Sequence, residues 1–456
     1  MKTPSLLALS MLALISMLLM TVNTAAGRGT ASNPHLAAES GDHAVDCGGE
    51  PCDAVARGFV TFFDRRLHGL GGNGRSCADC HMAGDHFQLA PHDVEMRFQI
   101  LRWERLWNRH ADDPLFRPID ADDFRTNGEN ASDFSNLRQN ALVRITFPLP
   151  PTMRLIDPIT NQPSSETFVD VWRRVPSVND VALTGPDGSN PWPRDPNHFG
   201  GYQLDGRVAT LQEQALGALT NHAQVQHAPP SQLLDDLSSF QRVLFTNHRV
   251  RALSDAVRTG AIPLPDPDPL LDPLEQQGKQ IFERACAQCH GGPGQSTALS
   301  SLPRFQDIGT QCPRPVDPAP GAARFAFAPC SASLARNART YEIKMIDGST
   351  GRRTSSDPGR ALLTGYVGGP APLDDWNKLD VPGLRGLSQT APYFHNNSAA
   401  TLEAVVDHYI EFFKRVEALH VPGTPVPPVA TTDGVHFDRH PTAAERAALL
   451  AYLRKL

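Results

Sequence analysis

The pentapeptides Cys77-Ala78-Asp79-Cys80-His81 and Cys286-Ala287-Gln288-Cys289-His290 share the pattern C-x-x-C-H. Two thiols three positions apart can each bind one vinyl group of the same porphyrin, and the adjacent His can bind its iron. A redox-active C-x-x-C does not need the following His. A zinc ribbon keeps its cysteine pairs much closer than the 209 residues that separate His81 from His290. The two pentapeptides therefore predict two covalently bound haem c groups and an electron-handling protein.

The N-terminus has the pattern of a secretory signal peptide. Lys2 is the only charged residue before an apolar run from Leu6 to Met20, and small residues follow at Thr24-Ala25-Ala26. This run of about 15 residues is shorter than the roughly 20 that span a bilayer. No later stretch is long and apolar enough to cross a membrane. We therefore expect residues 1–26 to be cleaved and the mature protein to be soluble and periplasmic.

The charge balance excludes one class of partner. The formal net charge of the 456 residues is −7, and it becomes −8 when residues 1–26 are removed. A mildly acidic chain is a poor nucleic-acid binder. A net negative charge would also suit an electron donor that carries a basic patch.

Four of the eight cysteines lie outside the two pentapeptides. Cys47 and Cys52 form one local pair, and Cys312 and Cys330 form another. An oxidising compartment favours a disulfide within each local pair. Free thiols and pairing across the two regions are the alternatives.

Helical apolar spacing marks seven segments of the chain. They are residues 53–68, 92–110, 209–221, 231–253, 274–285, 401–419 and 442–456. The last of them opens with a capping box, Thr442 and Glu445. The stripe of Met96, Ile100, Trp103 and Trp107 in the second segment is interpreted as core. Residues 111–200 are rich in loops and receive no assignment.

Alternating prolines mark residues 261–273 as a stiff linker. A helix and a haem motif precede this linker, and the same order restarts after it. We therefore predict an all-α fold with extensive loops and two cytochrome c-like domains, at residues 27–260 and 274–456.

Several blocks of sequence carry a resemblance to a known family. They are residues 58–81, 175–179, 204–215 and 278–290, and the most specific is Val381-Pro-Gly-Leu-Arg-Gly-Leu-Ser-Gln-Thr-Ala-Pro-Tyr-Phe-His395, followed by Thr401-Leu-Glu-Ala-Val-Val406. At these blocks the chain resembles the bacterial dihaem cytochrome c peroxidase family, which includes the MauG-like oxidases. In that family peroxide reacts at the N-terminal haem and the C-terminal haem is a six-coordinate electron relay. The resemblance implies that His81 and His290 are the proximal ligands of these two haems.

The resemblance also implies where the sixth ligand of the second haem lies, a few residues after Thr401-Leu-Glu403. Peroxidases have Met at that position and MauG-like proteins have Tyr. Counting from Thr401, the position is Tyr409. Neighbouring His408 is the competing ligand, and Met345 is a weaker alternative. A phenolate favours high oxidation states of the iron, whereas a thioether favours ferrous iron.

On the distal side of the first haem, Gln214 matches a Gln of the family. The family's catalytic Glu, ten residues later, falls on Gln224. A carboxamide cannot act as a general base. Either His222 or His227 replaces the Glu, or water relays the proton, or peroxide cleavage is not the main reaction.

Two further departures concern the first haem. The tryptophan that bridges the haems in the family is Leu204 here, and Tyr202 or Trp192 could relay electrons instead. No His lies between His110 and His198. We therefore expect the first haem to be five-coordinate or water-bound.

The family holds a calcium ion between its domains. The matching positions are Asn179 and the backbone carbonyls of Thr390 and Pro392. Hard oxygen donors of this kind suit calcium. The resemblance also implies a homodimer.

Three functions remain open at this point. The first is a periplasmic dihaem oxidoreductase that reduces hydrogen peroxide at the N-terminal haem. Its electrons would come from a small periplasmic donor, such as a cytochrome c or a cupredoxin, or from a protein or organic substrate. The second is a dihaem oxygenase of the rubber-oxygenase type that uses O₂, which a His408 ligand would favour. The third is a dihaem electron carrier in which both haems are six-coordinate.

Overall fold

The computed structural model describes residues 47–117, 119, 134–185, 201–296, 304–317, 324–369, 374–426 and 441–456. The predicted signal peptide and Trp192 lie outside these residues. In the part of the chain that is described, no helix is long and apolar enough to cross a membrane. The description below concerns the unit Cys47–Leu456.

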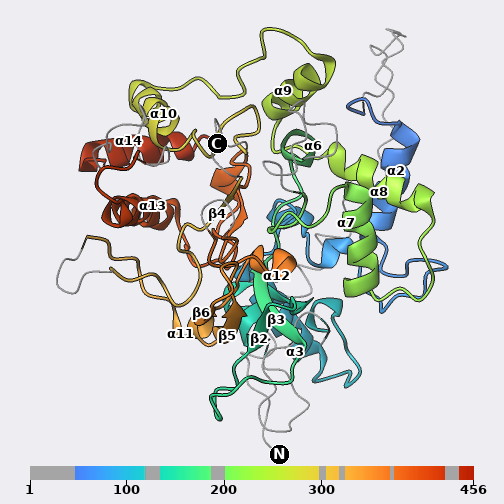
Figure 1. The fold of residues 1–456 in the computed structure, drawn as a ribbon. Coiled ribbons are helices and arrows are strands. Elements are labelled where there is room, and N and C mark those ends of the chain that lie inside the picture. Colours follow the sequence, from blue (N-terminus) through green and yellow to red (C-terminus); the bar gives the residue numbers. More distant parts are fainter. Residues whose placement is uncertain are drawn as a thin grey trace, which may run out of the picture. The chain divides into compact units, whose positions relative to one another are not determined.

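Two pairs of crossed helices repeat along the chain (Figure 1). Helix α2 (Cys52–Phe63) packs against α8 (Ser231–Arg242), and α10 (Pro273–Ala285) packs against α14 (Ala443–Leu453). Helix α2 leads to the first C-x-x-C-H motif and α10 leads to the second, as the repeated sequence order predicts.

A glycine allows the close approach in each pair. A Cβ atom on Gly58 of α2 would lie 2.0 Å from the carbonyl oxygen of Asp236, and one on Gly278 of α10 would lie 2.0 Å from that of Ala448. No side chain fits at such a distance, so glycine is required at both crossings.

The helix starts follow the capping signals in the sequence. Capping boxes form at the N-terminus of α10, with Asp272 and Glu275, and at the N-terminus of α14, with Thr442 and Glu445. The capping box of α14 was predicted. Helix α13 (Leu402–Leu419) begins after its N-cap Thr401, in agreement with the predicted segment. The predicted helix 231–253 is instead two helices, α8 and α9 (His248–Thr259), because Asn247 caps a new helix start.

The remaining described helices are short, apart from α3. They are η1 (Cys77–Asp79), η2 (Ala83–Asp85), α3 (Pro91–Glu104), η3 (Pro114–Phe116), α5 (Ser135–Asn140), α6 (Val181–Thr184), α7 (Leu211–Gly217), the π-helical turn η4 (Ala218–His222), α11 (Ala332–Ala335), α12 (Ala361–Thr364) and η5 (Leu387–Gln389).

The all-α prediction is only partly confirmed, because the described residues are mainly helical but also form small antiparallel sheets. Strand β1 (Leu142–Pro148) pairs with β3 (Phe168–Arg174), and β4 (Phe305–Gln306) pairs with β7 (Leu379–Asp380). The third sheet has the order β2 (Met153–Leu155), β5 (Arg339–Lys344), β6 (Thr350–Ser355). In it Met153 pairs with Ile343, so the sheet joins residues from both sides of the proline-rich segment 261–273.

The sequence contains signals for these strands that the all-α prediction did not use. The segments 142–148 and 168–174 are rich in β-branched and aromatic residues. Asp347-Gly348 between β5 and β6 is a strong hairpin signal. Buried side chains from β1, β2, β3 and β5 form one apolar cluster around Tyr341 and Trp376.

The apolar residues Met96, Ile100, Trp103 and Trp107, which we call the α3 stripe, are not part of the core as predicted. The buried side of α3 is formed by Val94 and Leu101, whereas Met96, Ile100, Trp103 and Trp107 are exposed. The helix has apolar residues on two sides, and spacing alone does not tell which side faces the core.

Both predicted local disulfides are present. Cys47 is bonded to Cys52 and Cys312 to Cys330. The four cysteines of the C-x-x-C-H motifs are not disulfide-bonded.

Candidate haem sites

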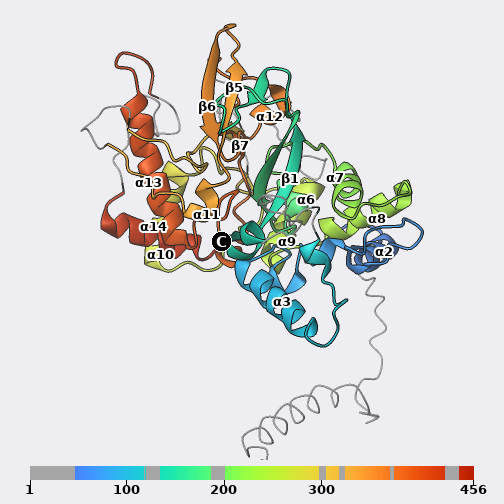
Figure 2. The same ribbon diagram turned by 90° about the horizontal axis from the view of Figure 1, so that it is seen from below.

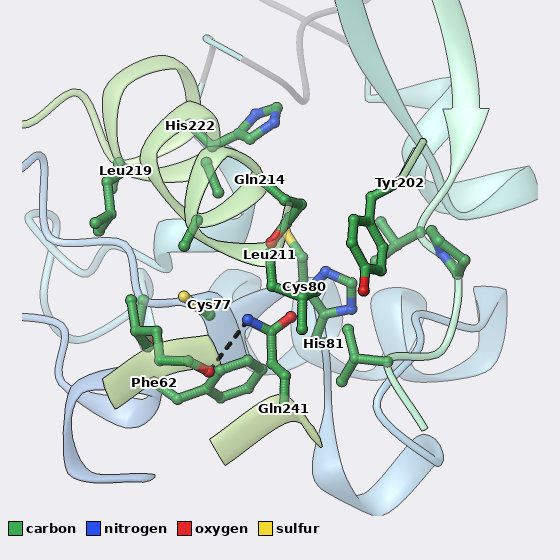
Figure 3. A pocket seen from close by; sticks show the side chains of 18 of the residues that line it. Phe62, Cys77, Cys80, His81, Tyr202, Leu211, Gln214, Leu219, His222 and Gln241 are labelled. Atoms are coloured by element: carbon green, nitrogen blue, oxygen red, sulfur yellow. Dashed lines mark hydrogen bonds between the residues drawn. The ribbon is translucent and has the colours of Figure 1, made fainter. Parts of the chain in front are cut away.

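The first C-x-x-C-H motif forms a single tight turn. Ser76 caps it through the carboxylate of Asp79, which accepts hydrogen bonds from Ser76 N at 2.9 Å and Ser76 Oγ at 3.0 Å. The backbone N–H groups of Cys80 and His81 both donate to the carbonyl of Cys77. The turn brings Cys77, Cys80 and His81 to the wall of one cavity (Figure 3).

The ring of His81 is oriented for metal binding. Its Nδ1 lies 2.9 Å from the carbonyl oxygen of Phe87. Since a carbonyl only accepts, Nδ1 carries the proton and Nε2 keeps a free lone pair for a metal. Burial lowers the pKa of His81, so the ring is in the neutral form that binds metal.

The cavity beside His81 has a volume of about 180 Å³. Its wall includes apolar side chains such as Leu67 and Val143, and among its polar side chains are Gln214, His222 and Tyr202 (Figure 3). An apolar cavity with a few polar groups is the usual form of a small-molecule site. The structure therefore brings together the predicted Gln214 and His222 with the predicted proximal ligand His81.

His222 ends the π-helical turn η4, which follows α7 directly. A π-turn adds one residue to the helical repeat and is frequent at functional sites. Residues of both α7 and η4 line the cavity.

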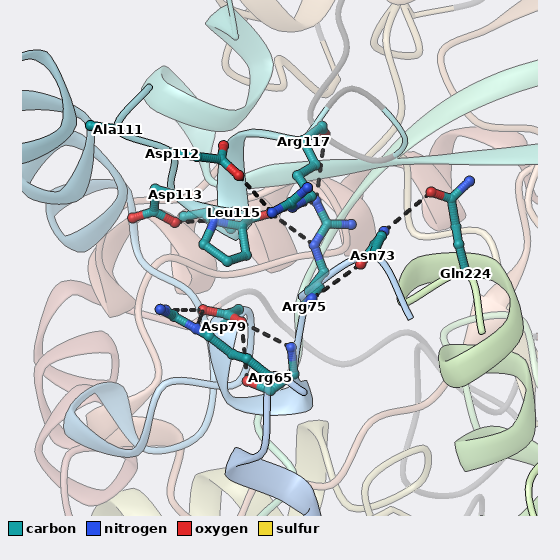
Figure 4. Close-up of polar contacts among 12 residues, drawn as sticks. Arg65, Asn73, Arg75, Asp79, Ala111, Asp112, Asp113, Leu115, Arg117 and Gln224 are labelled. Atoms are coloured by element: carbon teal, nitrogen blue, oxygen red, sulfur yellow. Dashed lines mark hydrogen bonds and ion pairs between the residues drawn. The ribbon is translucent and has the colours of Figure 1, made fainter. Parts of the chain in front are cut away.

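Gln224, the position of the family's Glu, lies outside the lining of this cavity. The residue is exposed, its φ of 51° is left-handed, and its Oε1 accepts a hydrogen bond from Asn73 Nδ2 at 3.2 Å (Figure 4). His227 is exposed as well and does not line the cavity. Of the four residues considered from sequence for the distal side of the first haem, Gln214 and His222 therefore line the cavity, and Gln224 and His227 do not.

Arg75 is a site residue that the sequence reasoning missed. It is 2% exposed, lines the cavity, and donates to the carbonyl of Pro114 through Nε and Nη2 and to that of His222 through Nη1, at 3.2 Å. Arg75 therefore connects the start of the first motif to the end of the π-helical turn. The sequence signal for this role is that a charged residue, Arg75, lies two positions before Cys77.

Asp79, inside the motif, is buried and pairs with two arginines, of which Figure 4 shows Arg65. Arg65 Nη2 lies 2.5 Å and Arg97 Nη2 3.1 Å from its Oδ1. Burial would raise the pKa of this carboxyl, but the hydrogen bonds from Arg65 and Ser76 and the two positive charges hold it below its usual value. The turn is thus held by a carboxylate that stays ionised.

The second motif repeats the turn. The N–H groups of Cys289 and His290 donate to the carbonyl of Cys286, at 3.1 and 2.8 Å. His290 Nδ1 lies 3.1 Å from the carbonyl of Pro382 and 3.3 Å from that of Gln295. Burial lowers the pKa of His290 to about 4, so it too is neutral with Nε2 left for a metal.

Tyr409 and His408 have different surroundings. Burial raises the pKa of the Tyr409 phenol, with a smaller contribution from Cys289 and Cys286. His408 Nε2 instead lies 2.8 Å from the carbonyl of Ile308. Its ring is 4.7 Å from the rings of Phe327 and Phe394. Of the two candidate ligands, His408 is therefore the one whose Nε2 a backbone carbonyl already holds.

The two motifs fit covalently bound haem. Each offers, on one turn, two cysteines that are not disulfide-bonded and a His whose Nδ1 is held by a carbonyl. The first also faces a cavity. Burial raises the pKa of Cys77 and Cys286 to about 12, so these thiols stay protonated until they react.

The positions matched to calcium do not fit the ion. The carbonyl of Thr390 accepts a hydrogen bond from Arg174 Nη2 at 3.1 Å, so a guanidinium already provides a positive charge there. The side chain of Asn179 donates to the carbonyl of His86 at 3.4 Å. Among the described residues, no group of three or more His, Cys, Asp or Glu is arranged to hold a metal ion.

The segment from Tyr202 to Leu204 lies between the two sites. Tyr202 lines the first cavity, and the carbonyl of Leu204 accepts a hydrogen bond from Asp380 N at 2.9 Å. Asp380 precedes Pro382, the carbonyl partner of His290, by two residues. The segment that carries the family's bridging tryptophan thus links the two sites here through backbone.

No family model and no curated protein matches this chain. Among solved structures it is similar to a MauG-like protein associated with microbial copper homeostasis, with 20% identity over 90% of both chains and a TM-score of 0.41. It is similar to the diheme peroxidase BthA from Burkholderia thailandensis, with 17% identity over 89% of this chain and 86% of the other and a TM-score of 0.38. Kuenenia stuttgartiensis hydrazine synthase follows with 17% identity over 82% and 94% and a TM-score of 0.30. A MauG-like protein and a diheme peroxidase are thus among the solved structures that this chain resembles, as its motifs predict.

Proposed function

We propose that this protein is a periplasmic dihaem c-type oxidoreductase that reduces hydrogen peroxide at its first haem. Cys77 and Cys80 would attach that haem and His81 would bind its iron. Cys286, Cys289 and His290 would do the same for the second haem. The observation that carries the proposal is the cavity that joins His81 to Gln214 and His222.

The polar residues of the cavity would handle the protons of the reaction. A haem held by His81 supplies the redox chemistry that cleaves the O–O bond. His222 can accept a proton from one peroxide oxygen and return it to the departing oxygen, as a general acid–base group does. Gln214 can only donate or accept hydrogen bonds, so its part would be to orient the peroxide. Arg75 would keep the His222 turn in place through the backbone carbonyl.

The second site would store or relay electrons. Tyr409 is the residue that we assign as sixth ligand. Because burial raises the pKa of its phenol, the phenolate requires a positive charge at this place, as a ferric iron would provide. A phenolate ligand favours the oxidised states of the iron.

The two alternatives differ in the ligands that they require. The oxygenase interpretation gains from His408 as a ligand, but His408 Nε2 is held by the carbonyl of Ile308. The carrier interpretation needs both haems to be six-coordinate, and at the first haem His222 would have to be the sixth ligand.

An electron paramagnetic resonance spectrum of the ferric, haem-loaded protein tests the proposal, before and after one equivalent of peroxide. We expect one high-spin signal from the first haem and one low-spin signal from the second, and both should disappear with peroxide. Two low-spin signals that ignore peroxide would identify an electron carrier. Tight O₂ binding by the reduced protein without a response to peroxide would identify an oxygenase.

A further inference from the structure

Arg174 is a charged residue in the wall of the cavity beside His81, which we call the first cavity. It is the last residue of β3, and Figure 2 shows β1, the strand with which β3 pairs. Val175, Pro176 and Ser177 follow Arg174 and line the same cavity. The strand therefore ends with a guanidinium at the site where the first haem would be attached.

Hydrogen bonds fix this guanidinium on one side and leave a donor on the other. Its Nη2 donates to Gln88 Oε1 at 2.6 Å and to the carbonyl of Thr390 at 3.1 Å. The backbone N–H of Arg174 donates to the carbonyl of His395 at 2.7 Å. Its Nε, in contrast, is buried and has no hydrogen-bond partner. A buried donor without an acceptor is unfavourable, so Nε fits an acceptor that a ligand of the cavity would bring.

The positive charge of Arg174 lacks a direct counterpart. Among the described residues, no carboxylate pairs with its guanidinium. Asp85 and Tyr393 act on it as weaker electrostatic partners, and Gln88 lies between Arg174 and Asp85, because Gln88 Nε2 donates to Asp85 Oδ1 at 3.4 Å. Burial lowers the pKa of Arg174 to about 10, so desolvation outweighs both partners and the side chain is still charged at neutral pH. Buried charges are normally paired, and this one calls for an anion.

The wall of the first cavity complements an anion. The described residues that line it include Arg75 and Arg174, and none of them is Asp or Glu. Asp79 of the adjacent motif already pairs with Arg65 and Arg97. Arg75 directs donors to backbone carbonyls, so Arg174 is the guanidinium that we assign to a ligand.

We propose that Arg174 is a carboxylate-binding residue of the first cavity. The inference rests on the haem attachment in the proposed function and adds the residue that would balance the charge of the haem. A haem bound to Cys77, Cys80 and His81 brings two propionates, and carboxylates are ionised at neutral pH. A guanidinium and a carboxylate form strong, charge-assisted hydrogen bonds. A propionate of the first haem is therefore the expected partner, and a free carboxylate that enters the cavity is the other source of the same chemistry.

This contact would affect the electronic state of the first haem. A fixed positive charge near an iron disfavours the ferric state, which carries one more positive charge than the ferrous state. The same guanidinium holds Gln88, which follows Phe87, and the carbonyl of Phe87 fixes the ring of His81. Arg174 would thus act on the first haem through its charge and through the segment that orients the proximal ligand.

Three variants of the haem-loaded protein test the proposal. Arg174→Gln removes the charge, and Arg174→Lys keeps it with a different donor geometry. The control is Arg144→Gln on β1, which changes the net charge equally. Val143 and Ile145 on either side of Arg144 line the first cavity, whereas Arg144 does not and pairs with Asp170.

Three measurements separate the effects. Spectroelectrochemical titration follows the reduction of each haem. Resonance Raman difference spectra between variant and wild type report changes in the propionate bending vibrations. Calorimetry with acetate as the probe detects binding of a free carboxylate.

We expect Arg174→Gln to shift the ferric-to-ferrous ratio of the first haem about tenfold toward ferric iron at a fixed potential, which is about 59 mV for a one-electron couple. The second haem should shift less. The propionate vibrations should change in Arg174→Gln and in Arg174→Lys but not in Arg144→Gln. Arg174→Lys should keep most of the wild-type potential, because the charge remains. Acetate should not bind to the wild type, since a propionate already occupies Arg174.

Other results would reassign or overturn the site. Acetate binding that is lost in Arg174→Gln, with unchanged propionate vibrations, would support the carboxylate site and make a free ligand its source. Unchanged vibrations in both Arg174 variants without acetate binding to the wild type would overturn the proposal, as would an equal shift in Arg144→Gln. If Arg174→Gln takes up no haem, Arg174→Lys and the wild type decide by the same two readouts. A first haem that ignores peroxide in the wild type would instead refute the proposed peroxide reaction and leave the Arg174 assignment intact.

Discussion

The two C-x-x-C-H motifs have nearly the same local structure and different surroundings. In both, a helix with an essential glycine crosses another helix, the motif forms one turn, and a backbone carbonyl holds the His Nδ1. The first His adjoins a cavity with Gln214 and His222, whereas at the second motif Tyr409 is the ligand that we propose. Attachment chemistry is therefore local to the motif, while reactivity depends on what the rest of the chain places opposite the His.

Replacing either proximal His should give the largest effects and separate the two roles. We expect His81→Ala to reduce peroxide turnover to the background rate while the low-spin signal of the second haem persists. His290→Ala should keep the reaction of the first haem with one peroxide but lose sustained turnover. Stopped-flow spectroscopy and electron paramagnetic resonance measure both. Turnover retained in His81→Ala would mean that the sites are assigned in the wrong order.

Alanine at the two crossing glycines tests whether the halves are equivalent in packing. A methyl group at Gly58 or Gly278 would meet a carbonyl oxygen at 2.0 Å, so the helices must separate. We expect each variant to lower the free energy of unfolding by about 1–3 kcal/mol or more, measured by urea denaturation.

Gly217→Ala in α7 is the matched control for the two glycine variants. Its nearest neighbour would be Asn221 Nδ2 at 3.9 Å, so alanine fits and should leave stability unchanged or raise it by up to about 1 kcal/mol. Equal behaviour of all three variants would contradict the role of the crossings.

Variants of Tyr409, the proposed sixth ligand of the second haem, test the difference between the two sites. Tyr409→Phe should convert the low-spin signal of the second haem to high spin, because the phenyl ring cannot bind iron. Tyr409→Met should keep it low-spin and raise its reduction potential, since a thioether favours ferrous iron. His408→Phe is the control and should stay low-spin. Loss of the low-spin signal in that control would make His408 the ligand.

The smallest expected effect concerns Asp79, whose counterpart in the second motif is the uncharged Gln288. The pKa of Asp79 is lower in the folded protein than in the unfolded chain. Its stabilising contribution is therefore complete above pH about 4 and is lost as pH falls through the folded pKa. Asp79→Asn should lower stability by about 1–3 kcal/mol at pH 6 and much less at pH 3. Urea unfolding at both pH values tests this, and a difference independent of pH would exclude the ion pairs as its cause.

Some features of this protein could be inferred from the sequence because the chemistry is local. Both motifs, both short-range disulfides and the capped starts of α13 and α14 depend on residues a few positions apart. The resemblance to dihaem peroxidases rested on similar short blocks. The strands carried local signals too, in their β-branched residues and in Asp347-Gly348, although the prediction passed over them.

Other features were decided only by the tertiary structure. Tyr409 and His408 are neighbours in sequence, and the tertiary structure holds His408 Nε2 on the carbonyl of Ile308 and its ring beside Phe327 and Phe394.

The same holds for α3 and for the distal side of the first haem. The α3 stripe has core-like spacing, yet the cluster around Val94 and Leu101 turns it outward. Gln224 matches a catalytic position by count, but the turn after η4 and the bond to Asn73 carry it out of the cavity. A side chain's function depends on its neighbours in space, and contacts between residues far apart in the chain set those neighbours.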